Sequence, residues 1–265
     1  MNSETDFVAR NTDFQTFTQR VTQGALSSLP TVDTSIITST TTVNQQAETV
    51  YTNTLTNNLL PGGDILTNKE CTIKDGIIGL TAKVGENIIL RRCVKYTLPN
   101  NYIGGIITSY IHNSINANSG AIGVIVALAP VTKSSTPLTK SHSAYPAIQD
   151  LGKKIAMHIA AAKPIYLNKD VIPNEELNRE KALAKETMQN QIQNKPEHIV
   201  NKILDGKLNK WYSEICLQDQ IYTLSDDNIK INKYVENISK AANYPVQVIG
   251  FISFRVGETA PPATN

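Results

Sequence analysis

The chain has 265 residues, of which 40% are hydrophobic and 18% charged, with a formal net charge of +2 and a pI near 8.3. This length and composition are sufficient for a sizeable core and two compact units. The small net charge excludes the strongly basic surface typical of nucleic-acid-binding proteins, so we expect a protein partner and no nucleic acid.

Cysteine usage and hydropathy exclude further classes. Cys71, Cys93 and Cys216 are odd in number and have no CxxC spacing, which argues against a disulfide framework or a zinc site and favours a reducing compartment. The longest apolar run, residues 121–130, is shorter than the roughly 18 to 20 residues of a membrane span. We therefore expect no membrane partner.

An acidic-aromatic pair opens the chain. Asp6 and Phe7 precede a predicted helix start near Asp13, where Thr12 and Gln15 have capping-box spacing. The helix would bury one face, because four apolar residues recur at helical intervals: Phe14, Phe17, Val21 and Ala25. The pattern predicts a charge and an aromatic ring side by side on a short turn.

Residues 27–68 are rich in Thr, Ser and Asn, and we interpret them as a loop insertion with a helical piece over residues 43–55. Beyond the insertion, the spacing predicts a helix over residues 72–84. Alternation of β-branched and aromatic residues predicts strands over 85–96, 102–111 and 121–128. Together these elements predict an antiparallel meander packed with helices.

A second Ser/Thr/Pro-rich stretch, residues 130–146, is interpreted as a linker before a helix over residues 151–162 with Asp150 as its N-cap. His158 lies on the apolar face of this helix. A histidine in that position is usually a satisfied core residue.

Two charged amphipathic helices follow, over residues 175–192 and 197–212. The turn between them is short, so they must form an antiparallel hairpin over residues 175–212. Trp211, at the base of this hairpin, is interpreted as a core residue rather than a contact.

The C-terminal part predicts a strand over residues 215–224, a helix over 228–242 and a closing strand over 246–256. Residues 260–265 are predicted to be a disordered tail. The closing strand repeats the pattern of residues 88–96, since each follows a helix and places Arg among apolar residues.

The predicted fold class is therefore α+β, with two related subdomains of antiparallel sheet packed with helices and a protruding helical hairpin. The N-terminal core subdomain would span residues 1–129 and the C-terminal one residues 147–259.

Sequence motifs for nucleotide binding and metal binding are missing or incomplete. Residues 68–71, Asn-Lys-Glu-Cys, differ from the guanine-reading NKxD motif at the last position, and no phosphate-binding GxxxxGK[ST] loop exists. Four histidines lie far apart without metal-ligand spacing. We expect no catalytic residues, no cofactor, no metal and no direct nucleotide binding. A thiol hydrolase that pairs Cys93 or Cys216 with His158 stays open as a minor alternative.

Three separated segments carry a family resemblance: residues 5–11 (Thr-Asp-Phe-Val-Ala-Arg-Asn), residues 155–164 (Ile-Ala-Met-His-Ile-Ala-Ala-Ala-Lys-Pro) and residues 248–258, the closing strand. Together, and in this order, they resemble elongation factor Ts, which releases GDP from the GTPase elongation factor Tu. The resemblance implies a guanine nucleotide exchange factor that has no active site of its own.

The resemblance also assigns partner-binding residues. Asp6 and Phe7 would intrude beside the helices that support the Mg²⁺ and phosphate site of the GTPase and disturb magnesium coordination. His158 would act from the second subdomain at the same interface, which reverses the core interpretation above, and the hairpin would widen the contact.

The family normally has a small helical module before the first motif, so we expect a chain that has lost this module or a fragment. The alternative function is therefore an interaction or assembly protein that binds elongation factor Tu with little exchange activity. The low-complexity insertions favour the mitochondrial matrix, with the bacterial cytoplasm as the alternative.

Overall fold

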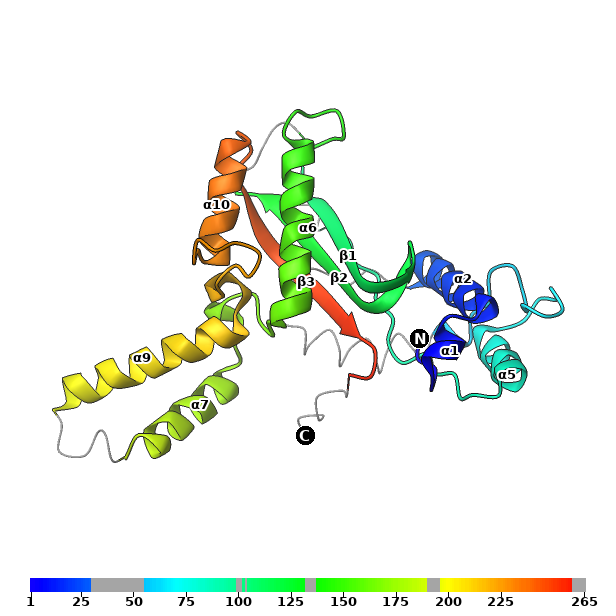
Figure 1. The fold of residues 1–265 in the computed structure, drawn as a ribbon, viewed down its shortest axis with the longest axis horizontal. Coiled ribbons are helices and arrows are strands. Elements are labelled where there is room, and N and C mark those ends of the chain that lie inside the picture. The colour runs from blue at the N-terminus through cyan, green and yellow to red at the C-terminus, as the bar shows by residue number, and fades with distance from the viewer. Residues whose placement is uncertain (30–54, 99–101, 103, 132–136, 190–195, 259–265) are drawn as a thin grey trace. The chain divides into compact units, whose positions relative to one another are not determined.

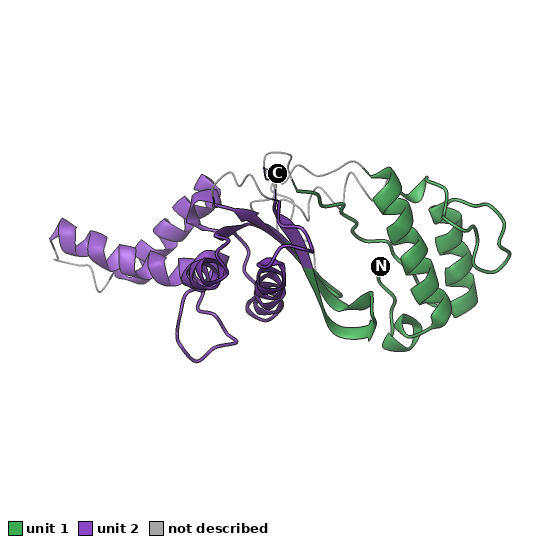
Figure 2. Cartoon of the chain, turned by 90° about the horizontal axis from the view of Figure 1, so that it is seen from above, with its two compact units in different colours: residues 1–101, 109–125, 252–265 green, residues 102–108, 126–251 purple. Residues whose placement is uncertain are grey.

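The structure is a computed structural model that describes residues 1–29, 55–98, 102, 104–131, 137–189 and 196–258. The chain forms two compact units: unit 1 contains residues 1–101, 109–125 and 252–265, and unit 2 contains residues 102–108 and 126–251 (Figure 2). Helices combined with an antiparallel sheet confirm the α+β class. The helical piece predicted over residues 43–55 falls outside the described residues except at its end, and the predicted tail lies wholly outside them.

Unit 1 contains the helices α1 (Asp6–Ala9), α2 (Thr12–Ser28) and α5 (Ile73–Val84) (Figure 1). Helix α2 begins one residue before the predicted start, and its N-cap is Asn11, whose side chain accepts from the Asp13 amide at 2.8 Å. Thr72 and Asp75 form a capping box at the start of α5. These caps begin both helices within a residue of where the sequence pattern predicts them.

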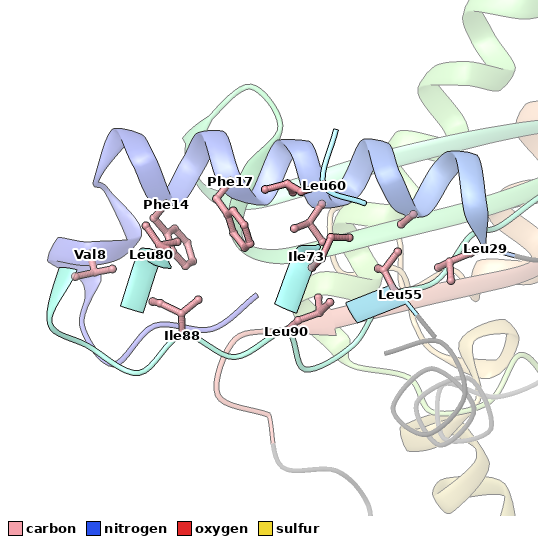
Figure 3. Close-up of a cluster of buried hydrophobic side chains, with 12 residues drawn as sticks. Val8, Phe14, Phe17, Leu29, Leu55, Leu60, Ile73, Leu80, Ile88 and Leu90 are labelled. Atoms are coloured by element: carbon pink, nitrogen blue, oxygen red, sulfur yellow. The ribbon is translucent and has the colours of Figure 1, made fainter. Parts of the chain in front are cut away.

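The core of unit 1 lies between α2 and α5 (Figure 3). The four apolar residues predicted on the buried face of α2 are all buried. Phe17 packs so closely on Gly76 of α5 that a Cβ there would lie 2.6 Å from the ring. Leu55 and Leu60 are also buried in this core. The interpretation of residues 27–68 as a loop insertion is therefore wrong for its last part, which packs into the unit.

The strand predicted over residues 85–96 is wrong. Ile89 forms an isolated antiparallel bridge with Asn2, and no strand is assigned to this segment in the described part of the chain. Ile88 and Leu90 are buried in the core of unit 1 and Ile89 is exposed. The alternation in the sequence thus marks an extended, half-buried chain, but the segment has no long ladder that would make it a strand. The predicted repeat between residues 88–96 and the closing strand therefore lacks its first strand.

One antiparallel sheet has the strand order β1-β2-β3, with β1 Ile106–Asn116, β2 Ser119–Pro130 and β3 Val246–Arg255. A two-residue turn joins β1 to β2. Two backbone hydrogen bonds set the register of β3 on β2: the amide of Val131 donates to Pro245 at 3.0 Å, and that of Val256 donates to Ala121 at 2.9 Å. All three strands contribute residues to both units.

In unit 2, helices α6 (Tyr145–Ala162) and α10 (Ile231–Ala241) pack against each other. Gly152 of α6 lies against Thr108 of β1 and Leu128 of β2, with no room for a side chain. The prediction of Asp150 as N-cap is wrong, because α6 begins earlier and Asp150 pairs with Lys154 one turn on, at 2.8 Å.

The helical hairpin of unit 2 consists of α7 (Asn174–Thr187) and α9 (Glu197–Ile215), which follow the short η3 (Lys169–Val171) and lie side by side (Figure 1). At its base Trp211 packs with Tyr166 and Ile172, as expected for a core residue. The phenol of Tyr166 donates a hydrogen bond to Glu176. The hairpin is thus anchored to unit 2 by both packing and a polar contact.

The strand predicted over residues 215–224 is also wrong. Helix α9 continues to Ile215 and η4 (Leu217–Asp219) follows it. Isolated bridges join Tyr166 to Cys216 and Ile221 to Lys230. The β-branched and aromatic residues of this segment therefore lie at a helix end, in a short 3-10 helix and at isolated bridges, and not in a strand. Within the described residues, no helix is both long and apolar enough to cross a membrane.

Candidate functional site

The acidic-aromatic pair lies on the short helix α1 of unit 1. Thr5 is its N-cap, and the Thr5 hydroxyl accepts from the Val8 amide at 3.4 Å. Val8 points into the core, while Phe7 is 82% exposed and Asp6 is exposed as well. The structure therefore brings a carboxylate and an aromatic ring to the surface side by side. We call residues 5–8 the tip.

The tip is held by Glu86, a residue that the sequence analysis missed. Its carboxylate accepts from the backbone amides of Thr5 at 3.0 Å and Glu4 at 3.2 Å, and also from the Thr5 hydroxyl. The hydrogen bond from the Thr5 hydroxyl is the main reason why the pKa of Glu86 lies below its usual range. Nothing local in the sequence signals this contact, because the partners lie 81 and 82 residues apart.

A pocket of about 500 Å³ opens in unit 1 beside the tip. Asp6 and Arg10 are among the polar residues that line the pocket, and its apolar lining includes Phe14, Ile122 and Phe254. The tip thus borders a concave surface with apolar walls.

His158 is placed differently from the pair on the tip. It belongs to α6 in unit 2 and is 0% exposed. The Thr223 amide donates to Nδ1 at 3.3 Å, and Nε2 lies 2.9 Å from Oε1 of Gln220. Because the Gln220 amide group donates to the carbonyls of Ala162 and Glu214, its Oε1 must accept from the ring. His158 is therefore the neutral tautomer that carries its proton on Nε2.

Burial sets the charge state of His158. Loss of hydration lowers the pKa of the imidazole, and the hydrogen bond with Gln220 raises it less. The ring also lies 6.1 Å from that of Tyr222, which stacks on Tyr234 at 4.1 Å. Ile221 and Leu224, in the same loop, expose their side chains. His158 thus fixes a loop that carries apolar groups to the surface, while the ring itself lies inside.

The three predicted site residues fall into two units. Asp6 and Phe7 are neighbours in unit 1, whereas His158 lies in unit 2. The partner-binding role of all three residues stays a prediction. For His158, a role at a partner surface would pass through Gln220 and the loop behind it.

The cysteines do not have the surroundings of activated nucleophiles. Desolvation raises the pKa of the half-buried Cys93, and it raises that of the buried Cys216 to about 12. Both ring nitrogens of His158 are bonded to Gln220 and Thr223. In the described ranges, no three His, Cys, Asp or Glu side chains come together as a metal site would require.

Comparison with known proteins adds the family context. Residues 4–258 match the family model described as elongation factor TS. Elongation factor Ts of Rhodospirillum centenum is 34% identical over 265 residues, which cover all of this chain and 72% of the relative. Those of Paramagnetospirillum magneticum and Clostridium botulinum are 33% and 31% identical over 258 residues, which cover 97% of this chain and 69% of each relative.

Proposed function

The chain belongs to the elongation factor Ts family, and we propose that it is a guanine nucleotide exchange factor that promotes GDP release from elongation factor Tu. Family membership supports a role in translation elongation. The observation that carries the finer proposal is the exposure of Phe7 beside Asp6 on an anchored turn. A large aromatic at 82% exposure gains free energy when a partner covers it.

The mechanism that we propose is differential binding. An exchange factor must bind the nucleotide-free GTPase more tightly than the GDP-bound form, because a ligand shifts an equilibrium only by its difference in affinity. An acceleration of about ten-thousandfold requires about 5.5 kcal/mol of such preference. Complete burial of one Phe side chain contributes about 1.5–3 kcal/mol. The ring of Phe7 would therefore supply part of the preference, and Asp6 and the remaining interface would supply the rest.

In this proposal Phe7 inserts next to the helices that support the magnesium and phosphate site of the GTPase. Asp6 brings a carboxylate to the same place, and carboxylate oxygens are ligands that Mg²⁺ accepts. The negative charge would also oppose the phosphates of GDP. Both effects would destabilise the GDP-bound form of the GTPase more than its nucleotide-free form, as differential binding requires.

His158 contributes indirectly in this proposal. Its neutral ring holds Gln220 and Thr223, and so fixes the exposed side chains of Ile221 and Leu224. The hairpin of α7 and α9 would widen the contact. The protein itself would catalyse no covalent step and bind no nucleotide.

The relatives compared above are bacterial, which favours the bacterial cytoplasm over the mitochondrial matrix as the place of action. In either compartment the proposal requires that elongation factor Tu be present.

A nucleotide-release assay tests the function. Elongation factor Tu loaded with a fluorescent GDP is mixed with excess unlabelled GDP and increasing amounts of the chain. The wild-type chain should accelerate release to a saturating rate, and Phe7→Ala and Asp6→Asn should reduce the acceleration. If the wild-type chain binds the GTPase and leaves the release rate unchanged, the chain is an interaction or assembly protein instead.

A further inference from the structure

The hydrogen bonds of Glu86 point to a role beyond stability, and we propose that Glu86 is a positioning residue that presets the tip for its partner. This inference rests on the proposed function, since it concerns how Phe7 is presented to elongation factor Tu. Glu86 itself contacts the start of the tip, where it is hydrogen-bonded to Glu4 and Thr5.

The carboxylate of Glu86 makes three contacts with two consecutive residues. It accepts from two adjacent backbone amides, those of Glu4 and Thr5, and from the Thr5 hydroxyl. The same hydroxyl accepts from the amide of Val8 and so caps α1. One side chain thus connects the entry of the tip with its first helical turn. A carboxylate suits this task, because it offers two oxygens as acceptors and needs no donor of its own.

The backbone brings Glu86 to this place. Helix α5 ends at Val84, and its C-cap Gly85, with a φ of 73°, turns the chain sharply after the helix. Three residues after Glu86, Ile89 exchanges two backbone hydrogen bonds with Asn2, at 2.8 and 3.0 Å. Residues 2–5 therefore run antiparallel to residues 86–89 and are attached to them at both ends.

The other side of the tip is anchored by packing. Val8 is buried in the core of unit 1, while Phe7 next to it is exposed. Phe7 therefore stands between a residue bonded to Glu86 and a residue buried in the core. Its ring contributes little to the fold, but its backbone is fixed from both directions.

A fixed backbone in the free protein lowers the entropic cost of binding. If the tip were loose, its residues would have to be ordered when Phe7 entered a partner, and that cost would be subtracted from the affinity. Ordering a single backbone residue corresponds to about tenfold in an equilibrium constant. Loss of the Glu86 contacts should therefore weaken binding by about tenfold, while the maximal effect of Phe7 once bound is retained.

Amide hydrogen exchange tests the positioning without any GTPase. In Glu86→Ala and Thr5→Val, the hydrogen-bonded amides within residues 4–9, those of Glu4, Thr5, Val8 and Ala9, should exchange about tenfold faster than in the wild type. Thr5→Ser keeps the hydroxyl and should restore the protection. Glu70→Ala removes an exposed carboxylate of the same unit that lies outside this set of contacts, and it should leave residues 4–9 unchanged. Circular dichroism is the check that each variant is folded.

The GDP-release assay tests the consequence. Glu86→Ala should raise the half-saturating concentration of the folded chain about tenfold and keep the maximal rate, with the folded fraction of each variant measured by circular dichroism so that a loss of folded protein is not counted as a loss of affinity. Unchanged hydrogen exchange at residues 4–9, or an unchanged half-saturating concentration, overturns the proposal.

The two proposals can fail separately. If the wild-type chain binds the GTPase without releasing GDP, the exchange function is wrong and affinity becomes the second readout. A weaker affinity of Glu86→Ala then still supports positioning by Glu86, and an equal affinity overturns it. A wild-type chain that does not bind elongation factor Tu overturns both.

Discussion

His158 donates through Nε2 to Oε1 of Gln220 at 2.9 Å, and the orientation of the Gln220 amide leaves it no other role than that of acceptor. The amide of Thr223 donates to the other ring nitrogen. A protonated imidazole would bring a second N–H to face this donor. The hydrogen bonds of His158 with Gln220 and Thr223 therefore stabilise the loop only while the ring is neutral.

The first prediction concerns pH. Burial lowers the pKa of His158 in the folded state, whereas in the unfolded chain a histidine titrates near about 6.5. The stabilisation is therefore complete above that pH, and it is lost as the pH falls through the lower pKa of the folded state, because the unfolded state then binds more protons. Urea denaturation from pH 7.5 down to pH 5.5 (values about one unit either side of the unperturbed pKa) should show a falling free energy of unfolding.

A His158→Gln variant, which cannot titrate, is the control for this prediction. Its free energy of unfolding should be lower at neutral pH by about 1–3 kcal/mol, since buried hydrogen bonds are lost. Its dependence on pH over the same range should be weaker. An equal slope for both proteins would mean that other groups are responsible.

The second prediction separates two phenylalanines of unit 1. Phe17 is 0% exposed and Phe7 is 82% exposed. Phe17→Ala should cost about 3–5 kcal/mol of stability because it leaves a cavity. Phe7→Ala should stay within about 0.5 kcal/mol of the wild type. Thermal unfolding measures both, and a marked loss of stability in Phe7→Ala would show that the ring supports the fold.

The ring should nevertheless matter for release of GDP. Ile78 on α5 is an exposed apolar residue of the same unit, at 59%, and is a matched control. Phe7→Ala should reduce the acceleration, and Ile78→Ala should leave it unchanged. Equal losses in the two variants would indicate a general apolar effect and would contradict a specific role of the tip.

The third prediction uses two glycines of unit 2. A Cβ on Gly152 would lie 2.7 Å from Cγ2 of Thr108, and even closer to the hydroxyl, whereas a Cβ on Gly206 of α9 would meet nothing within 4 Å. Gly152→Ala should therefore destabilise the protein by about 1–3 kcal/mol through overpacking. Gly206→Ala should stabilise it by up to about 1 kcal/mol, since alanine favours a helix interior. Urea denaturation measures the free energy of unfolding of both variants. A decrease for Gly152→Ala and an increase for Gly206→Ala would agree with the packing of α6 on the sheet.

The fourth prediction concerns the thiol alternative. The buried Cys216, with a pKa raised to about 12, should resist alkylation, and Cys71, which is half-buried near the surface, should react before it. Mass spectrometry after a mild alkylating treatment identifies the order. The alkylated protein should promote GDP release from elongation factor Tu as fast as the untreated protein does. Loss of activity that follows modification of Cys93 or Cys216 would favour the hydrolase.

Helices were the most predictable part of the fold. The spacing of Phe14 and Phe17 predicted the buried face of α2, and both residues are buried in the core of unit 1. Helical periodicity is a local property, and so are caps such as Thr72 and Asn11. For that reason a single sequence contains almost everything that determines where these helices begin.

Strands and long-range contacts were less predictable. Alternation marks residues 85–96 as extended, but a strand also needs a partner of similar length, and here Ile89 meets only a short terminal segment at Asn2. Glu86 could not be predicted for a related reason, because its role depends on a hydrogen bond with Thr5, which lies far away in the sequence. For His158, the apolar face of its helix correctly indicated burial, while the motif around it favoured a surface role.

The exposed ring at position 7 has a practical consequence for protein engineering. Since Val8 and Glu86 hold the backbone, the side chain between them can be exchanged without rebuilding the scaffold. Bulkier, smaller or polar substitutes at this position would change the exposed side chain alone. Under the proposed function, a modest library at position 7 would yield factors with graded affinity for the GTPase on an unchanged scaffold.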